Sequence, residues 1–380
     1  MITILANYER ISLFHTMIPF FLFNKDIKRN HGKSVFRITQ SAAWCLKNDK
    51  NKILFMERCF QHREPRDLED IELDLLKKLR DKYKTIVFFC GQPEAGTNRL
   101  DILPFVDHLF YKSVFSNRSE YKKILYGKNL FSDYYHKNFG VNDNPEYINR
   151  MQITDEQAAK LKLSWNIGIG TYPRRNWPQR LGAVLARAGM PLLGQYTGGK
   201  SLKRALLPGT GKKIKNSVFS GNRSISVHAR IDPVTCPSIA FQRVHFLNLI
   251  QTLNVKNKNL FLTGTVKQEQ YYRELMDSKI VLSPFGWGEV CFRDFEAILS
   301  GALLLKPDMS HLVTWPNVYI PYETYIPLEW NGSDLMEKTK HYLDDEKERQ
   351  RIVANAFEQY KNETALIKSR AESLLSSFIY

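Results

Sequence analysis

The chain has 380 residues, of which 43% are hydrophobic and 25% are charged, and its formal net charge is +16. This composition is that of an ordinary globular protein, which excludes a largely disordered chain, and the length is enough for two domains with separate cores. The positive charge predicts an anionic partner, such as nucleic acid, a membrane surface or a phosphate-bearing substrate, without choosing among them.

Short apolar runs alternate with a helical pattern in the first half of the chain. A helix is predicted at 67–83, where acidic residues come early and basic residues late. Strands are predicted at 2–6, 34–38, 52–56, 85–90 and 108–111. Strands separated by helices predict a parallel α/β sheet.

The second half repeats this alternation after a different middle. Residues 165–178 hold several glycines and prolines and predict an interdomain connection, and residues 201–222 predict a mobile loop. The predicted strands after them are 225–229, 260–263, 279–283 and 302–306, and the predicted helices are 238–253, 268–278, 289–300 and a long charged one at about 334–377.

The cysteines and the N-terminus bear on location. The five cysteines form no CxxC pair, which predicts free thiols in a reducing compartment. The apolar stretch at 11–23 is interrupted by His15 and lacks a small-residue cleavage site, so we expect no signal peptide. The sequence has no uninterrupted apolar run of about 18 residues, so no membrane-spanning helix is predicted. We therefore expect a cytoplasmic protein, with peripheral attachment to the inner face of the membrane as an open alternative.

One glycine-rich turn and the helix after it carry the chemistry. A predicted buried strand runs into Gly286 and Gly288, which permit a tight turn and close approach of a ligand to the backbone. The helix is predicted to begin directly afterwards, and the free N–H groups at a helix start attract phosphate. Helical steps of about 100° then place Glu289, Arg293 and Glu296 within an arc of about 60°.

This set of side chains suits a nucleoside diphosphate sugar. Arg293 is expected to pair with the diphosphate, because a guanidinium group matches phosphate oxygens. Glu296 is expected to accept hydrogen bonds from two ribose hydroxyls, and Glu289 to contact hydroxyls of the sugar. Trp287, between the glycines, is included in the donor-binding set. From geometry alone, a turn followed by a helix with solvent-facing charges is an equally good interpretation.

A longer pattern surrounds this turn. It consists of Gly264, the pair Tyr271 and Tyr272, the strand Val281-Leu-Ser-Pro, and the pattern Arg-x-x-Glu-Ala-x-x-x-Gly-Ala-x-x-x-x-Pro that begins at Arg293. This order, over residues 260–319, resembles the donor-binding half of GT-B glycosyltransferases, most closely the exostosin-like and CgeB-like branches. The resemblance implies an α/β fold of the GT-B type, with two Rossmann-like domains facing a cleft.

The resemblance also implies roles for basic residues and for the reaction. Arg230, Arg243 and Lys267 are each expected to meet the diphosphate, with a solvated basic residue as the open alternative for each. The common retaining motif has seven residues between its two glutamates, whereas six separate Glu289 from Glu296. The stereochemical outcome therefore stays open.

The sequence also bears on metal and on the catalytic base. It contains no Asp-x-Asp pair, by which GT-A enzymes hold a divalent metal. We therefore expect no cofactor and no metal, with a helix dipole and basic side chains stabilising the leaving diphosphate. An inverting reaction needs a base from the N-terminal domain. Glu94 and Asp101 follow predicted strands and are the candidates, with a turn carboxylate or helix cap as the alternative for each.

The predicted division is an acceptor-binding domain at 1–165, a nucleotide-sugar-binding domain at 166–345 and a C-terminal helix at 346–380 that packs back across both. The predicted function is sugar transfer from a nucleotide sugar to a glycan or lipid-linked glycan at an anionic membrane surface. Bacterial lipopolysaccharide or capsule synthesis is the natural destination. The competing hypotheses are a basic nucleic-acid-binding protein and a non-catalytic glycan-binding protein, which nucleotide binding would distinguish.

Overall fold

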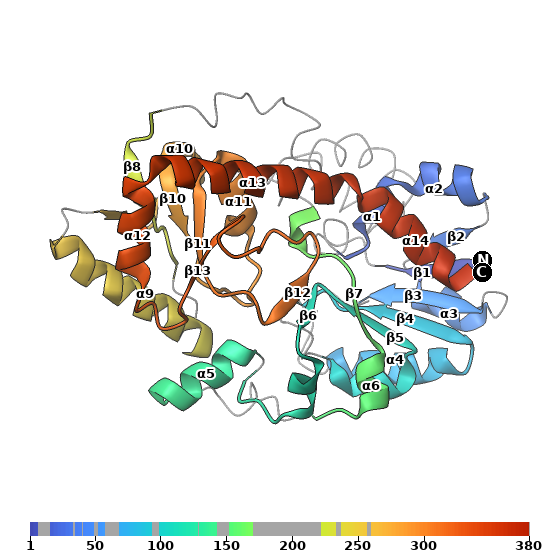
Figure 1. Ribbon diagram of the computed structural model, residues 1–380. Helices are drawn as coiled ribbons and strands as arrows, with labels where there is room; N and C mark the ends of the chain where they lie inside the picture. The colour runs from blue at the N-terminus through green and yellow to red at the C-terminus, as the bar shows by residue number, and fades with distance from the viewer. Residues whose placement is uncertain are drawn as a thin grey trace.

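The computed structural model describes residues 1–6, 16–32, 35–39, 41–48, 52–57, 68–92, 99–127, 129–142, 152–169, 222–232, 237–256 and 260–379. Within these ranges two parallel sheets lie in separate units, each covered by helices (Figure 1). We call the unit around the six-stranded sheet the N-terminal unit and the unit around the five-stranded sheet the C-terminal unit. The predicted α/β fold class, with two Rossmann-like units, is confirmed.

The N-terminal sheet has the strand order β2-β1-β3-β4-β5-β7, and all its pairs are parallel. The strands are β1 (Ile2–Leu5), β2 (Phe36–Thr39), β3 (Ile53–Glu57), β4 (Thr85–Phe89), β5 (His108–Tyr111) and β7 (Leu161–Leu163). All but β7 lie within two residues of their predicted positions. The sequence analysis missed β7 because it is only three residues long and has a lysine at its centre.

Alternate residues of these strands enter different cores, as the pleat of a strand requires. On β4, Ile86 and Phe88 pack with α3 (Ala42–Lys47), α4 (Leu68–Arg80) and the 3-10 helix η2 (Leu100–Phe105). Val87 and Phe89 pack on the opposite face, with α1 (Ile18–Leu22) and α2 (Asn24–His31). Burial on both faces explains why these strands are continuous apolar runs.

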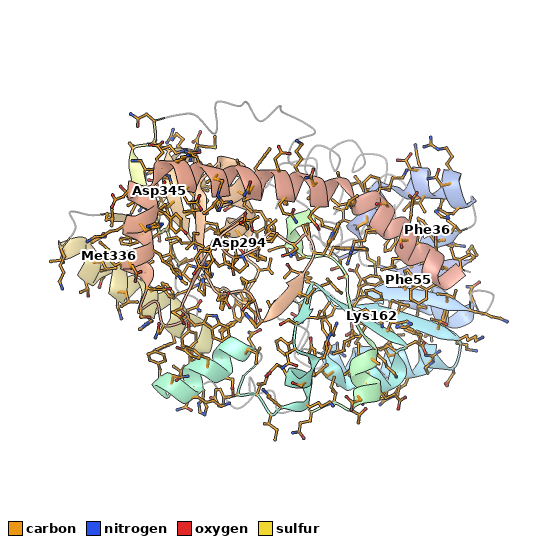
Figure 2. The ribbon with its side chains drawn as sticks, in the orientation of Figure 1. Phe36, Phe55, Lys162, Asp294, Met336 and Asp345 are labelled. Atoms are coloured by element: carbon orange, nitrogen blue, oxygen red, sulfur yellow. The ribbon has the colours of Figure 1, made fainter. Side chains whose placement is uncertain are left out.

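An aromatic cluster fills the core under α1. The ring of Phe20 lies 6.2 Å from that of Phe36, 6.0 Å from Phe55 and 5.8 Å from Trp165, mostly edge to face. Figure 2 labels Phe36 on β2 and Phe55 on β3, the two strands that flank β1 in this sheet. The sequence analysis did not predict α1, whose five residues are too few to show helical periodicity.

The C-terminal sheet has the strand order β13-β11-β10-β8-β9, again all parallel. Its strands are β8 (Ile225–His228), β9 (Phe261–Leu262), β10 (Ser278–Leu282), β11 (Leu303–Pro307) and β13 (Ile326–Leu328). Its helices include α9 (Pro237–Lys256), α10 (Gln268–Met276), α11 (Phe292–Ser300) and α12 (Leu335–Asp344). The sequence analysis predicted all of these strands except β13, which is three residues long with a central proline.

The predicted long C-terminal helix is wrong as one element. It is divided into α12, α13 (Glu346–Ala365) and α14 (Ile367–Ile379). The side chain of Asp345 accepts a hydrogen bond from the Glu348 N–H, which caps a new helix start and ends α12. The charged, helix-favouring composition continues across both breaks, so the sequence pattern does not reveal them. Within the described ranges, no helix combines the length and apolar character that crossing a membrane requires.

Several segments cross between the units. The helix α5 (Leu130–Phe139), which lies between β5 and β7 in sequence, packs against α9 of the C-terminal unit. The strand β6 (Ser113–Phe115) pairs antiparallel with β12 (Leu312–Thr314), and we call this pair the interunit ribbon. The helix α14 returns to the N-terminal unit, where it packs on α1 and buries Ile367, Ala371 and Leu375 (Figure 1).

Candidate functional site

The start of α11 differs from its prediction at 289–300. Cys291 is extended, with φ −115° and ψ 152°, and its N–H donates to the Asp294 carboxylate at 2.9 Å. Asp294 thereby sets the first helical residue at Phe292, three residues later than predicted. Arg293 and Glu296 stay one turn apart on the helix, whereas Glu289 lies in the preceding loop. The predicted common arc of all three residues is therefore wrong for Glu289.

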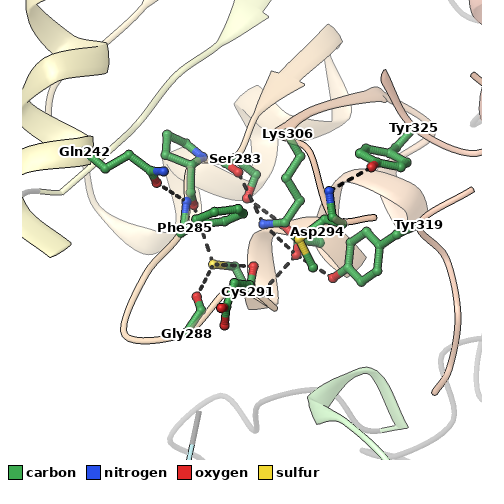
Figure 3. Close-up of polar contacts among 12 residues, drawn as sticks. Gln242, Ser283, Phe285, Gly288, Cys291, Asp294, Lys306, Tyr319 and Tyr325 are labelled. Carbon is green, nitrogen blue, oxygen red and sulfur yellow. Dashed lines mark hydrogen bonds and ion pairs between the residues drawn. The ribbon is translucent and has the colours of Figure 1, made fainter. Parts of the chain in front are cut away.

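Asp294 is the centre of a buried polar network (Figure 3). Its two oxygens accept hydrogen bonds from Ser283 Oγ and Tyr319 OH, each at 2.6 Å. The Nζ of Lys306 lies 3.1 Å from it, and both charged side chains are fully buried. Burial and the neighbouring carboxylate raise the pKa of Tyr319 well above its ordinary value, so its hydroxyl remains a donor. The network joins the end of β10, the start of α11 and β11.

The glycine-rich turn is held from behind by α9. The Phe285 N–H donates to Gln242 Oε1 at 2.7 Å, and Arg243 Nε donates to the Phe285 carbonyl at 2.9 Å. Gln242 in turn donates to the hydroxyl of Tyr135 on α5 at 2.6 Å. A Cβ on Gly286 would lie 2.9 Å from Arg243 Nη2, so the close approach predicted for this glycine is used by the protein itself.

Arg243, predicted to bind the diphosphate, is therefore placed as a brace for the turn. Its Nη1 also donates to the Asp232 carbonyl at 2.5 Å. Gly288 closes the same turn, because its carbonyl accepts from the Gly286 N–H at 2.9 Å. The sequence analysis did not identify Gln242 or Tyr135, since neither lies in a motif and the contact joins residues 107 positions apart.

A second cluster lies where β8 and β9 end. The hydroxyls of Tyr271 and Tyr272 on α10 donate to the two oxygens of Glu296 at 2.8 and 3.1 Å. Arg293, which lies on α11 with Glu296, donates through Nη2 to the carbonyl of Arg230. The Arg293 Nε is buried and has no hydrogen-bond partner among the described residues. The carboxylate is thus held in place, and one donor of the guanidinium is buried without a partner.

Arg230 and His228 complete the wall of this cluster. Arg230 pairs with Glu274 through Nε and Nη2, at 2.9 and 2.8 Å, and also donates to the Thr263 carbonyl. These contacts hold the pKa of Glu274 below its ordinary value. Burial and the charge of Arg293 lower the pKa of His228 from 6.5 to about 4, so its ring is neutral at pH 7. Of the two arginines, Arg293 is the one with a buried Nε that has no partner among the described residues.

The remaining predicted site residues lie outside the cluster of Arg293 and Glu296. Lys267 is exposed at the start of α10, and Trp287 is 48% exposed at the glycine-rich turn. Glu289 is fully buried, 3.6 Å from His311. Asp101 lies on η2, and both of its oxygens accept hydrogen bonds from Arg99 at 3.1 Å. Glu94 lies outside the described residues.

The described side chains also bear on the expectation that the protein binds no metal. Among the residues that the structure describes, no group of three or more His, Cys, Asp or Glu side chains could hold a metal ion. Metal independence stays a prediction, because ranges such as 170–221 lie outside the description.

Comparison with known families places the C-terminal part of the chain. Residues 248–376 match the family described as "Glycosyl transferase-like". The matched range includes the glycine-rich turn, α10, α11 and the whole cluster of Tyr271, Tyr272, Arg293 and Glu296. The predicted enzyme class, a glycosyltransferase, is confirmed. The match does not distinguish an exostosin-like from a CgeB-like branch.

Comparison of whole structures gives distant likenesses. An α-glucosyltransferase in complex with UDP has a TM-score of 0.44 at 9% identity, over 99% of this chain and 98% of that one. HepE from Anabaena in complex with UDP has a TM-score of 0.43 at 10% sequence identity, over 99% of both chains. A UDP-forming α,α-trehalose-phosphate synthase from Burkholderia vietnamiensis has a TM-score of 0.42 at 11% sequence identity. The similarity covers 96% of this chain and 84% of that one. No curated protein sequence matches the chain.

Proposed function

We propose that this glycosyltransferase moves a sugar from a nucleoside diphosphate sugar to a glycan or lipid-linked glycan acceptor. The observation that supports this most is the cluster of Arg293, Glu296 and the two tyrosines at the end of β8 and β9. Ligands of parallel α/β sheets bind outside the carboxyl ends of the strands, which is where this cluster lies.

Each side chain of the cluster has a chemical task in this proposal. Arg293 offers its unpaired Nε to a diphosphate oxygen, a charge-assisted contact that strengthens as the leaving group gains charge. Glu296 is already oriented by Tyr271 and Tyr272, so it can accept from ribose hydroxyls with little further loss of side-chain freedom. Neutral His228 adds no positive charge beside the diphosphate, so in this proposal Arg293 supplies it.

The proposal assigns the acceptor to the N-terminal unit. Asp101 and Glu94 remain its candidates for the base, both after strands of the N-terminal sheet. Asp101 is engaged by Arg99, so its use as a base requires that this ion pair opens. Closure of the units around donor and acceptor would exclude water, which otherwise hydrolyses the donor.

The destination of the sugar is the least constrained part of the proposal. The net charge of +16 suits an enzyme that works peripherally at an anionic membrane surface, on a lipid-linked or polyanionic glycan. Synthesis of bacterial lipopolysaccharide or capsule fits this chemistry. A soluble acceptor would be indicated if activity were independent of anionic vesicles.

A nucleotide-binding panel tests the donor. We expect ligand-detected NMR to show binding of one class among UDP, GDP, CMP and dTDP sugars. Arg293→Ala should weaken that binding and the turnover at least tenfold, because a hydrogen bond to a charged group contributes roughly 1.5–3 kcal/mol. Arg273→Ala, an exposed arginine on α10, is the matched control and should change neither. Activity should also survive EDTA; loss that Mn²⁺ restores would contradict the metal-free proposal.

The competing hypotheses predict different results from the same panel. If none of the nucleotide sugars binds, while oligonucleotides bind with a steep salt dependence, the protein is a nucleic-acid binder and the proposal is wrong. If glycans bind but no nucleotide sugar does, it is a non-catalytic glycan-binding protein.

A further inference from the structure

Glu289 is a buried carboxylate that the described protein does not satisfy. Its side chain is 0% exposed, and neither oxygen has a hydrogen-bond partner among the described residues. The nearest cationic group is His311, whose Nε2 lies 3.6 Å from Oε1, beyond a hydrogen bond. A buried carboxylate without hydrogen bonds is costly, so this position indicates a ligand that donates to it.

His311 shares this property, and its position is set from both units. Neither of its ring nitrogens has a hydrogen-bond partner among the described residues, and the side chain is 14% exposed. Its ring lies 5.0 Å from that of Trp330 and 6.3 Å from that of Phe285. Its carbonyl accepts from the Ser116 N–H at 2.9 Å, just before the interunit ribbon begins at Leu312.

The pair therefore lies where the units meet. On the side of the N-terminal unit, burial raises the pKa of Tyr121, and the charge of Glu289 adds to this rise. Tyr121 is itself held by the ribbon, because its hydroxyl accepts from the Phe115 N–H at 3.1 Å. Glu289 comes from the C-terminal unit, whereas His311 is anchored to a strand of the N-terminal unit.

The chemistry of the pair selects a neutral, hydroxyl-rich ligand. A carboxylate only accepts hydrogen bonds, whereas an imidazole donates from at least one ring nitrogen. A sugar hydroxyl both donates and accepts, so it satisfies both side chains at once. A phosphate carries negative charge at neutral pH and would be repelled by Glu289. The ring of Trp330 beside His311 suits the apolar C–H face of a sugar.

We propose that His311 is a sugar-binding residue, which together with Glu289 binds hydroxyls of the sugar being transferred. The interunit ribbon positions His311, so the sugar subsite is complete only when both units hold their relative places. This inference rests on the proposed function, since the pair would bind the sugar of the same donor whose diphosphate contacts Arg293.

The test compares a nucleotide with its sugar conjugate. Binding of UDP and of UDP-glucose, or of the pair that the panel selects, is measured by calorimetry for wild type, His311→Asn and His311→Gln. We expect the dissociation constant for the nucleotide to stay within twofold and that for the nucleotide sugar to rise about tenfold. The matched control is His136→Asn, whose part-buried ring is also stacked, 3.7 Å from Tyr126, but is hydrogen-bonded to the Val141 carbonyl.

The outcomes separate this inference from the function on which it rests. If the His311 variants melt like wild type and bind the nucleotide sugar as tightly, or weaken both ligands equally, His311 does not bind the sugar. Glu289→Gln should show the same selective loss, and the double variant should lose less than the sum of the single losses, because both contact one group. If wild type binds no nucleotide in the panel, the proposed function itself fails.

Discussion

Two oppositely charged residues of the C-terminal unit are fully buried and depend on specific partners. Asp294 and Lys306 are both inaccessible, and serine, tyrosine and backbone donors satisfy the remaining capacity of the carboxylate. Such a network contributes more to a unique arrangement of its elements than to net stability, because desolvation offsets much of the attraction. Removing one partner, however, leaves a buried charge uncompensated.

Replacing Lys306 should therefore be strongly destabilising. We expect Lys306→Met to lower the free energy of unfolding by about 3–5 kcal/mol, because Asp294 loses its counter-charge in the interior. Urea unfolding measures this. The control is Lys361→Met, whose lysine is 60% exposed and pairs with Glu358, and which should cost less than about 1 kcal/mol. Equal effects of the two changes would mean that the buried pair is not formed.

His228 should make stability depend on pH. Its pKa is lowered from 6.5 to about 4 by burial and Arg293, so the unfolded chain takes up this proton before the folded protein does. Stability from this residue is present above pH 6.5 and is lost as pH falls towards 4, with a slope of at most about 1.4 kcal/mol per unit. His228→Gln should flatten that part of the profile in urea unfolding at several pH values. An unchanged slope would show that the ring is accessible to protons.

Among the elements, α11 depends on close packing at its far side. The helix places Phe295 against the 3-10 helix η5 (Ile167–Ile169), where Gly168 leaves room for the ring. The Gly168 carbonyl also accepts from Tyr360 OH of α13 at 2.5 Å. The segment that follows the N-terminal sheet thus packs on the helix that carries Arg293 and Glu296.

A side chain at Gly168 should disturb this contact. Its Cβ would lie 2.3 Å from Cε1 of the Phe295 ring and 2.9 Å from Asn166 Oδ1. We expect Gly168→Ala to destabilise the protein by about 2–3 kcal/mol through overpacking, measured by thermal or urea unfolding. Gly140→Ala is the comparison, because its φ of +66° is strained for alanine although no atom lies within 4 Å. It should cost only about 1 kcal/mol, and a larger loss there than at Gly168 would contradict the packing argument.

In the whole molecule, segments from each half of the chain lie on the other unit. The helix α5 lies on the C-terminal unit, α14 on the N-terminal unit, and the ribbon joins β6 to β12. Arg370 of α14 donates to the Ser164 carbonyl at 3.2 Å and lies 4.6 Å from the Trp315 ring, so it contacts segments of both halves. Relative motion of the units must therefore bend or slide these crossings.

Loss of packing by α14 should destabilise the distant N-terminal unit. Leu375 is fully buried in the core that contains strands of the N-terminal sheet, and Leu375→Ala should cost about 2–5 kcal/mol. Leu366→Ala is the control, because Leu366 is 53% exposed between α13 and α14 and should change stability by less than about 0.5 kcal/mol. If both variants unfold at the same urea concentration as wild type, α14 does not pack as described.

The sequence by itself determined the elements whose signal is local. Apolar runs such as 85–90 predicted strands buried on both faces. The turn-and-helix pattern around Gly286 and Arg293 predicted the donor region. Both predictions are possible because periodicity and backbone freedom depend on consecutive residues. The same reasoning failed for α1 and β7, which are too short for a periodic signal, and for the start of α11, which the side chain of Asp294 decides.

Only the tertiary structure decided which side chains are available for chemistry. Arg230, Arg243 and Arg293 are alike in sequence, yet Glu274 engages the first, the Phe285 carbonyl engages the second, and the third keeps an unpaired donor. His311 lies beside Glu289 at the start of the ribbon, which pairs strands almost 200 residues apart. Hydrogen bonding and desolvation depend on distances between remote segments, and these distances arise only when both sheets have formed and packed.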